Sequence, residues 1–232
     1  MTRSMYLSMT RAEVCQQLER VGVVPVIRAP SPELATQAAE AILAGGISVF
    51  EITMTVPDAP QVIRVLKSRL GDRALVGAGT VLDANGARAC IEAGAAFIVS
   101  PGFDAPTLSL AHEAGIATMP GALTPTEVIT AWKAGADIVK IFPASAMGGA
   151  SYLRALKGPL PQIKLMPTGG VNLSTARDFI AAGAVALGVG SELVDMTALT
   201  AGRADVLTAR ASEFLAAVGA ARQRDSTRAA PA

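Results

Sequence analysis

Several kinds of residue are scarce in this chain, and each scarcity excludes a class of protein. The 232 residues include only two cysteines, Cys15 and Cys90, which can build neither a disulfide framework nor a metal-binding motif. Both fall in helix-like segments, which favours buried free thiols. Aromatic residues make up 4% of the chain, and its net charge of +1 comes without a basic run. This composition argues against nucleic acid as a main partner.

Long apolar runs are also missing. No run of roughly 18 apolar residues occurs, so the sequence predicts no membrane-spanning helix. The first seven residues, MTRSMYL, lack the long apolar core of a signal peptide. We therefore expect a cytoplasmic protein that does not engage a membrane.

The chain is rich in small apolar residues and repeats one local pattern. Hydrophobic residues make up 51% of the sequence. Helix-like stretches end in Ala-Gly or Gly-Gly and lead into short apolar strands, with a period of about 20 to 25 residues, as in one βα unit. The predicted strands are 23–28, 48–54, 74–79, 96–100, 116–119, 137–142, 163–167 and 184–189. The predicted helices are 11–21, 32–44, 59–70, 84–93, 105–114, 125–134, 152–156, 173–182 and 204–218.

Eight βα units after an opening helix predict an α/β fold, a (β/α)8 (TIM) barrel with an extra N-terminal helix. The alternative is an open doubly wound sheet. Ser31, Thr124 and Asn172 are expected to cap helix starts. Residues 1–222 are expected to form a single domain, and the polar stretch 223–232 a flexible tail.

One lysine lies in the middle of an apolar strand. Lys140 shares a face of strand 137–142 with Ile138 and Phe142, whereas Val139 and Ile141 lie on the other face. A buried ammonium is costly unless it is paired or neutral. A neutral lysine amine is the nucleophile that forms Schiff bases with carbonyl substrates. A structural lysine that reaches solvent or pairs with a carboxylate is the alternative.

One carboxylate has a similar place in strand 48–54. Alternation puts Phe50, Ile52 and Met54 on the helix-facing side and Glu51 with Thr53 on the inner side. A carboxylate there must be paired, hydrogen-bonded or raised in pKa. Glu51 is therefore either a general acid/base or the structural partner of a buried cation.

Active residues of such barrels lie at the carboxyl ends of the strands. Arg28 ends its strand and can clamp a carboxylate or phosphate, or form a plain surface ion pair. Thr80 follows a glycine-rich strand end and offers a hydroxyl. The turn at Pro101 can line the mouth or be a plain loop.

Two glycine-rich strand ends occur where barrels of this kind bind phosphate. Gly169 and Gly170 directly precede a helix, and Gly190 and Ser191 follow the last strand. Backbone N–H groups at a helix start suit an anion.

Other polar residues fit plainer interpretations. His112, the only histidine, is expected on a helix surface, away from the chemistry. Lys164 begins a strand, which is the wrong end for catalysis, and is expected to be solvated or structural.

Five motifs follow one another along the chain: EITMTVPDA (51–59), GAGTV (77–81), SPG (100–102), KIFP (140–143) and PTGGV (167–171). In this order they resemble motifs of the 2-keto-3-deoxy-6-phosphogluconate (KDPG) and 4-hydroxy-2-oxoglutarate (KHG) aldolase family. The resemblance covers about residues 23–194. It implies a class I aldolase, a (β/α)8 barrel that needs no metal or organic cofactor and is usually a homotrimer.

The resemblance also implies roles for single residues. Lys140 matches the Schiff-base lysine, and Glu51 matches the carboxylate that transfers protons. The residues expected to contact the substrate are Arg28, Thr80, Pro101, Phe142, Thr168, Gly169, Gly170, Gly190 and Ser191. Many members carry an arginine four positions after the glutamate, where this chain has Thr55. Another branch has an arginine that Arg28 matches, so Arg28 is expected to bind the substrate carboxylate.

The sequence thus predicts an enzyme that cleaves a 2-keto-3-deoxy-6-phospho sugar acid, KDPG in the first place, to pyruvate and glyceraldehyde 3-phosphate. KHG and the galactonate analogue of KDPG are alternative substrates. Two other classes stay open. A phosphosugar isomerase or epimerase would use Glu51 as its base and Lys140 only electrostatically. A non-catalytic anion-binding barrel would bind ligands without turnover.

Overall fold

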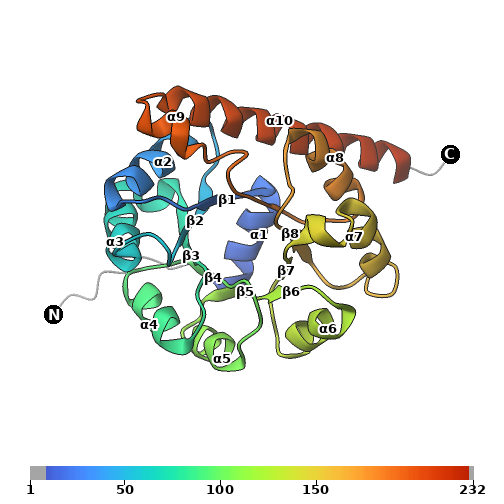
Figure 1. Cartoon of the computed structure of the whole chain (residues 1–232). Coiled ribbons are helices and arrows are strands. Elements are labelled where there is room, and N and C mark those ends of the chain that lie inside the picture. Colours follow the sequence, from blue (N-terminus) through green and yellow to red (C-terminus); the bar gives the residue numbers. More distant parts are fainter. Residues whose placement is uncertain (1–8, 230–232) are drawn as a thin grey trace.

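The computed structural model describes residues 9–229 and has parallel strands surrounded by helices (Figure 1). The strands are β1 (Val23–Ile27), β2 (Val49–Thr53), β3 (Leu75–Gly79), β4 (Phe97–Val99), β5 (Ala117–Met119), β6 (Gly121–Ala122), β7 (Val139–Ile141), β8 (Leu165–Pro167) and β9 (Leu187–Val189). The α-helices are α1 (Arg11–Val21), α2 (Pro32–Ala44), α3 (Ala59–Leu70), α4 (Ala84–Glu92), α5 (Ala105–Glu113), α6 (Pro125–Lys133), α7 (Ala150–Lys157), α8 (Leu173–Ala181), α9 (Met196–Thr200) and α10 (Ala204–Ala229). Two short 3-10 helices are η1 (Gly71–Arg73) and η2 (Ala144–Met147).

All strand pairs are parallel, and the sheet is curled. Six strands pair in the order β5-β4-β3-β2-β1-β9, and three pair in the order β6-β7-β8. Only Pro120 separates β5 from β6, because proline has no N–H to donate to a ladder. Isolated parallel bridges join Leu165 to Ala184 and Thr168 to Gly188. The carboxyl ends of the strands consequently meet at one edge.

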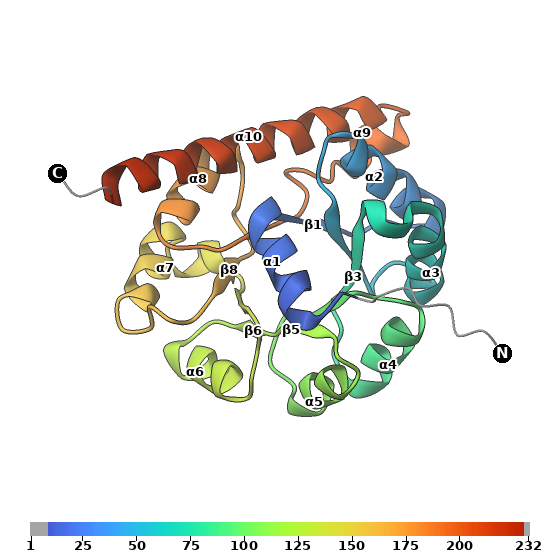
Figure 2. The same cartoon turned by 180° about the vertical axis from the view of Figure 1, so that it is seen from behind.

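Hydrophobic side chains form two clusters on opposite faces of the strands. Phe50 and Ile52 of β2 belong to the cluster shared with the helices, whereas Val49 belongs to a smaller cluster inside the curled sheet. The inner cluster also contains Val14 and Leu18 of α1, which lies across the strands in Figure 2. The alternation predicted for this strand is therefore confirmed, and it leaves Glu51 on the inner face.

A polar cluster ties α1 to the sheet at the amino ends of the strands. Arg11 pairs with Asp137 at 2.8 Å, and the other carboxylate oxygen of Asp137 accepts the N–H of Thr118 at 2.9 Å. His112 Nε2 lies 3.0 Å from the Thr118 hydroxyl and 3.6 Å from Asp137. The expectation that His112 is a surface residue is wrong, since its side chain is only 20% exposed. Burial and the Arg11 charge lower its pKa, although Asp137 acts in the opposite direction.

Replacing Asp137 by alanine is expected to destabilise the fold by about 1–3 kcal/mol, because Arg11 loses its partner and the buried Thr118 N–H is left unpaired. Urea unfolding followed by circular dichroism measures this change. The matched control is Glu40→Ala, which removes the exposed Arg69–Glu40 pair and is expected to cost less than about 1 kcal/mol. Equal losses in both variants would contradict the structural role of the cluster.

The carboxyl-terminal helix is longer than predicted. The sequence pattern ended the last helix at 218, whereas α10 continues to Ala229 and overlaps the predicted tail 223–232. Residues 230–232 lie outside the described residues. Arg222 anchors this extension because its guanidinium donates to the carbonyl oxygens of Glu19, Arg20 and Val185. These contacts are tertiary, so no local sequence pattern revealed them.

Other local predictions are confirmed. Ser31, Thr124 and Asn172 cap α2, α6 and α8, and each side chain accepts a backbone N–H of the first turn. The two cysteines are buried free thiols, and burial raises the pKa of each to about 11. Within residues 9–229, the helices are too short or too polar to cross a bilayer.

Candidate active site

Lys140 is the central residue of β7 and lies on its inner face. It is 5% exposed, and its neighbours Val139 and Ile141 pack on the helix side. Its Nζ lies 5.3 Å from the centre of the Phe142 ring. Among the described residues, no hydrogen bond and no ion pair within 4.0 Å engages this amine. The side chain is therefore buried, and its amine, which faces only the Phe142 ring among the described residues, is available to a ligand.

Glu51 occupies the equivalent face of β2. It is 1% exposed, and neither carboxylate oxygen has a hydrogen-bond partner in the described part of the chain. Burial raises the pKa of this carboxyl, although the charges of Lys140 and Arg28 favour its ionised form. An orphaned buried carboxylate with a raised pKa is typical of a proton-transfer group. The two inner-face residues predicted from alternation are thus brought within electrostatic reach of each other.

Arg28 follows β1 at the same edge. Its side chain is exposed and has no hydrogen bond or ion pair to any described residue. A cavity of about 500 Å³ lies beside it and is also lined by Gly190 and Ser191. A free guanidinium in a cavity at the strand ends suits an anionic group.

Thr80 and Pro101 follow β3 and β4 at this edge, and both are half-buried. Thr80 adopts a φ of 57°, which is unfavourable for a residue with a β-carbon. The turn at Pro101 is held by the Ser100 hydroxyl, which donates to the Gly102 carbonyl at 2.6 Å. Both predicted residues therefore lie in constrained segments beside the inner face.

The loop after β8 combines an orphaned hydroxyl with two glycines. Thr168 is 7% exposed, and its Oγ1 has no partner among residues 9–229. Gly169 and Gly170 have φ values of 90° and 74°, which other residues rarely adopt. Their N–H groups make no hydrogen bond to the described residues, and α8 begins directly afterwards, capped by Asn172. This loop offers free donors at a helix start.

Gly190 and Ser191 form the corresponding loop after β9. The Gly190 carbonyl accepts the N–H groups of Leu193 and Val194, at 3.0 and 2.9 Å. Within the described residues, the N–H groups of Gly190 and Ser191 remain without a partner. Two loops with free donors thus lie at the carboxyl ends of β8 and β9.

Sequence reasoning missed one ion pair beside the site. Arg210 of α10 pairs with Asp195, the N-cap of α9, at 3.1 Å, and both line the cavity next to Arg28. Helix α9 was not predicted, and Arg210 lies far along the chain on a helix without a local motif. Only the tertiary fold brings this pair to the site.

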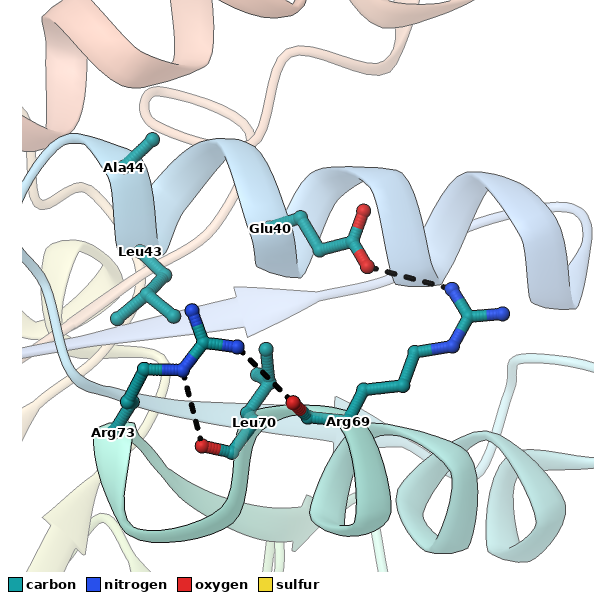
Figure 3. Close-up of a pocket in the computed structure, with 6 residues that line it drawn as sticks. All are labelled: Glu40, Leu43, Ala44, Arg69, Leu70 and Arg73. Carbon is teal, nitrogen blue, oxygen red and sulfur yellow. Dashed lines mark hydrogen bonds and ion pairs between the residues drawn. The ribbon is translucent and has the colours of Figure 1, made fainter.

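Two other features lie away from this edge. Lys164 pairs with Glu19 at 2.6 Å and is 46% exposed, which confirms its expected structural role. A pocket of about 470 Å³ lies between α2 and α3 (Figure 3). Its polar groups interact with one another, and none of the predicted site residues lines it.

Comparisons with known proteins point to the same family as the five sequence motifs. The family model for KDPG and KHG aldolase matches residues 14–209. The KHG/KDPG aldolase of Escherichia coli (strain K12) is 40% identical over 191 residues, which are 82% of this chain and 89% of that protein. The 2-dehydro-3-deoxy-phosphogluconate aldolase of Dickeya dadantii is 40% identical over 194 residues, covering 84% and 91% of the two chains.

Solved structures give the same result. A KDPG aldolase from Legionella pneumophila, with pyruvate captured as a covalent carbinolamine, superposes with a TM-score of 0.80 at 31% identity, covering 86% of this chain and 97% of that one. A structure described as native KDPGal has a TM-score of 0.79 at 33% identity, covering 87% and 96%. The present chain belongs to the KDPG and KHG aldolase family and is therefore an aldolase, a carbon–carbon lyase.

Proposed function

We propose that this chain cleaves KDPG through a Schiff base on Lys140. The observation that carries the proposal is the pair of buried side chains Lys140 and Glu51 on the inner faces of β7 and β2, neither of which has a hydrogen bond or ion pair to the described residues. Burying both groups without a partner is costly for stability, and catalysis accounts for that cost. The covalent pyruvate adduct of the Legionella relative supports the same chemistry here.

The amine of Lys140 attacks the C2 ketone, and water leaves to give an iminium. Glu51 removes the proton of the C4 hydroxyl, the C3–C4 bond breaks, and its electron pair enters the iminium to form an enamine. The aldehyde product departs. Glu51 returns the proton to C3, and water hydrolyses the resulting iminium to pyruvate and free Lys140. The dry inner face and the fixed side chains supply positioning.

The remaining residues are proposed to hold the two ends of the substrate. Arg28, Thr80, Pro101, Phe142 and Thr168 contact the keto-acid part. The free N–H groups of Gly169, Gly170, Gly190 and Ser191 bind the phosphate, in the loops where barrels of this kind bind it. This phosphate site is the reason for preferring KDPG over KHG, whose distal group is a carboxylate.

Measuring kcat/KM for KDPG, its galactonate analogue and KHG tests the substrate. KDPG is expected to give the highest value, because only the phosphorylated acids can use the donors of both loops. A higher kcat/KM for KHG would overturn the phosphate assignment, and a higher value for the galactonate analogue would reassign the stereochemical preference.

Replacing Arg28 by alanine is expected to raise KM for the keto acid by about 10- to 100-fold with little change in kcat, because one charged hydrogen-bonding contact to the bound acid is lost. Steady-state kinetics measures both constants. Arg64→Ala, an exposed arginine of α3, is the matched control and is expected to leave KM unchanged. An unchanged KM in Arg28→Ala would contradict the carboxylate role.

We also propose that the strands close into one (β/α)8 barrel in a cytoplasmic homotrimer. The bridges beside β8 and β9, and the single residue between β5 and β6, support closure. A designed cage built from symmetric oligomeric domains contains a related fold, with a TM-score of 0.81 at 32% identity over 89% of this chain and 75% of that one. Sedimentation equilibrium measures the assembly, and a monomer at micromolar concentration would contradict the trimer.

A further inference from the structure

Two glycines of β3 face the inside of the curled sheet, and one of them lies against Glu51. Neither Gly77 nor Gly79 has a positive φ, so the backbone at both positions suits any residue. A β-carbon at position 79 would lie 2.6 Å from Cδ and 3.0 Å from Cγ of Glu51, and closer still to Oε1. Any side chain at position 79 therefore requires the Glu51 carboxylate, which fills this space, to shift.

Two other site residues also lie in space that a glycine leaves open on a neighbouring strand. A β-carbon at Gly188 would overlap the Thr168 hydroxyl, and one at Gly121 would overlap the backbone of Pro101. Neither glycine has a positive φ. Three site residues are thus each seated against the bare backbone of a neighbouring strand.

The Gly79 backbone is held against β2 by the strand ladder. The β2–β3 ladder pairs Thr53 with Gly79, and the Met54 N–H donates to the Gly79 carbonyl at 2.8 Å. Glu51 is 1% exposed, so its side chain has no open solvent into which it can turn. An added methyl group at position 79 must therefore displace the carboxylate.

We propose that Gly79 is a positioning residue that fixes the Glu51 carboxylate for proton transfer, an inference that rests on the proposed role of Glu51. The proposal expects imine formation by Lys140 to survive a displaced carboxylate, whereas proton transfer at C3 does not. The enzyme-bound pyruvate iminium loses a C3 proton to the Glu51 carboxylate, giving an enamine and a carboxylic acid, and the reverse step returns a proton from the exchanged acid. In deuterium oxide, this cycle exchanges the methyl hydrogens of pyruvate for deuterium.

The test compares two readouts in Gly79→Ala. Borohydride reduction with pyruvate reports the iminium on Lys140, and NMR reports deuterium entering the pyruvate methyl group. The adduct is expected to form as in wild type, whereas exchange falls about 100-fold, since a displacement on the order of 1 Å at a reacting group has effects of this size. Exchange at the wild-type rate in the folded variant would overturn the proposal.

Gly77→Ala is the matched control. It lies on the same strand and face and is the ladder partner of Glu51, but its β-carbon would overlap the ring of Phe97 and not the Glu51 side chain. Its melting temperature is expected to fall, with the ratio of exchange to adduct formation kept near the wild-type value. An equal drop of that ratio in both variants would reduce Gly79 to a structural role and overturn the proposal.

Double variants keep the inference testable if Gly79→Ala fails to fold. The carboxylate is absent in Glu51→Ala, so adding Gly79→Ala is expected to lower its melting temperature less than it lowers that of wild type. In Glu51→Asp, the shorter side chain withdraws from position 79, so adding Gly79→Ala is expected to reduce exchange less than tenfold. The proposal would be overturned if Gly79→Ala lowered the melting temperature of Glu51→Ala as much as that of wild type and reduced exchange in Glu51→Asp as much as in wild type.

Failure of the proposed function has a different signature. The proposed mechanism would be overturned if the wild-type protein formed no adduct on Lys140. It would also be overturned if Glu51→Ala exchanged pyruvate hydrogens as fast as wild type. The melting temperatures of the double variants would still decide whether Gly79 seats the Glu51 carboxylate.

Discussion

Lys140→Ala is expected to lower kcat/KM for KDPG by at least about 10⁴-fold and to abolish the borohydride-trapped pyruvate adduct. Without the amine no iminium forms, and the electron pair of the C3–C4 bond has no acceptor. Lys140→Arg is expected to be equally inactive, although it keeps a positive charge beside Glu51. Peptide mass mapping after borohydride reduction locates the adduct, and a pyruvate-coupled assay measures turnover.

Lys164→Ala is the matched control for this prediction. Lys164 also belongs to the β7–β8 region, but it is 46% exposed and paired with Glu19. Its replacement is expected to leave both adduct and turnover unchanged. An adduct on another lysine in folded wild-type protein would contradict the assignment. Turnover retained in Lys140→Arg would instead indicate that the lysine acts through its charge and not through an imine.

The positions of the two central groups were predictable because they depend on local alternation. Phe50 and Ile52 mark the helix-facing side of β2, so Glu51 must lie on the other side. Val139 and Ile141 mark the same side of β7 and place Lys140 inside. Because all strand pairs are parallel, both residues are expected toward the same edge, but their proximity also depends on how the two sheets curl. The burial of both side chains agrees with that reasoning.

Contacts between distant segments were not predictable from local patterns. His112 sits at the end of an amphipathic helix, where nothing in its neighbours indicates Thr118 and Asp137 as partners. The Arg210–Asp195 pair depends on where α10 crosses the sheet edge. The sequence shows Gly79 only as part of a glycine-rich strand end, whereas in the structure the Glu51 side chain of β2 lies against it. These contacts depend on how segments far apart in the sequence pack against one another.

The second large effect concerns the proton-transfer carboxylate. Glu51→Gln is expected to lower kcat/KM by about 10²–10⁴-fold, the usual contribution of a positioned general acid/base, while the pyruvate adduct on Lys140 still forms. The amide matches the carboxylate in size, so the contact with Gly79 is kept. Retained adduct formation separates this defect from that of Lys140→Ala. Loss of the adduct in Glu51→Gln would instead indicate that the carboxylate is needed to form the imine.

The same variant tests the electrostatics of the site through stability. Burial raises the pKa of Glu51 in the folded protein above its ordinary value of 4.5. Between the ordinary and the raised pKa, the folded state binds more protons than the unfolded state, so Glu51 makes stability fall as the pH rises. Below pH 4.5 this contribution is fully present, and it is lost above the raised pKa. Glutamine does not ionise, so Glu51→Gln is expected to gain melting temperature relative to wild type as the pH increases.

Glu127→Gln is a control of opposite sign. The pKa of Glu127 is lowered by hydrogen bonds from the backbone of Thr124 and Leu123 at the start of α6. Its contribution to stability is present above the ordinary pKa and is lost as the pH falls through the lowered one. Glu127→Gln should therefore melt below wild type at neutral pH, and the difference should shrink in acid. Calorimetry at pH 4 and pH 8 measures both variants.

If Glu51→Gln followed the pattern of Glu127→Gln, the Glu51 carboxylate would have to be stabilised by partners in the folded protein. The account of an unpartnered group held for proton transfer would then be wrong.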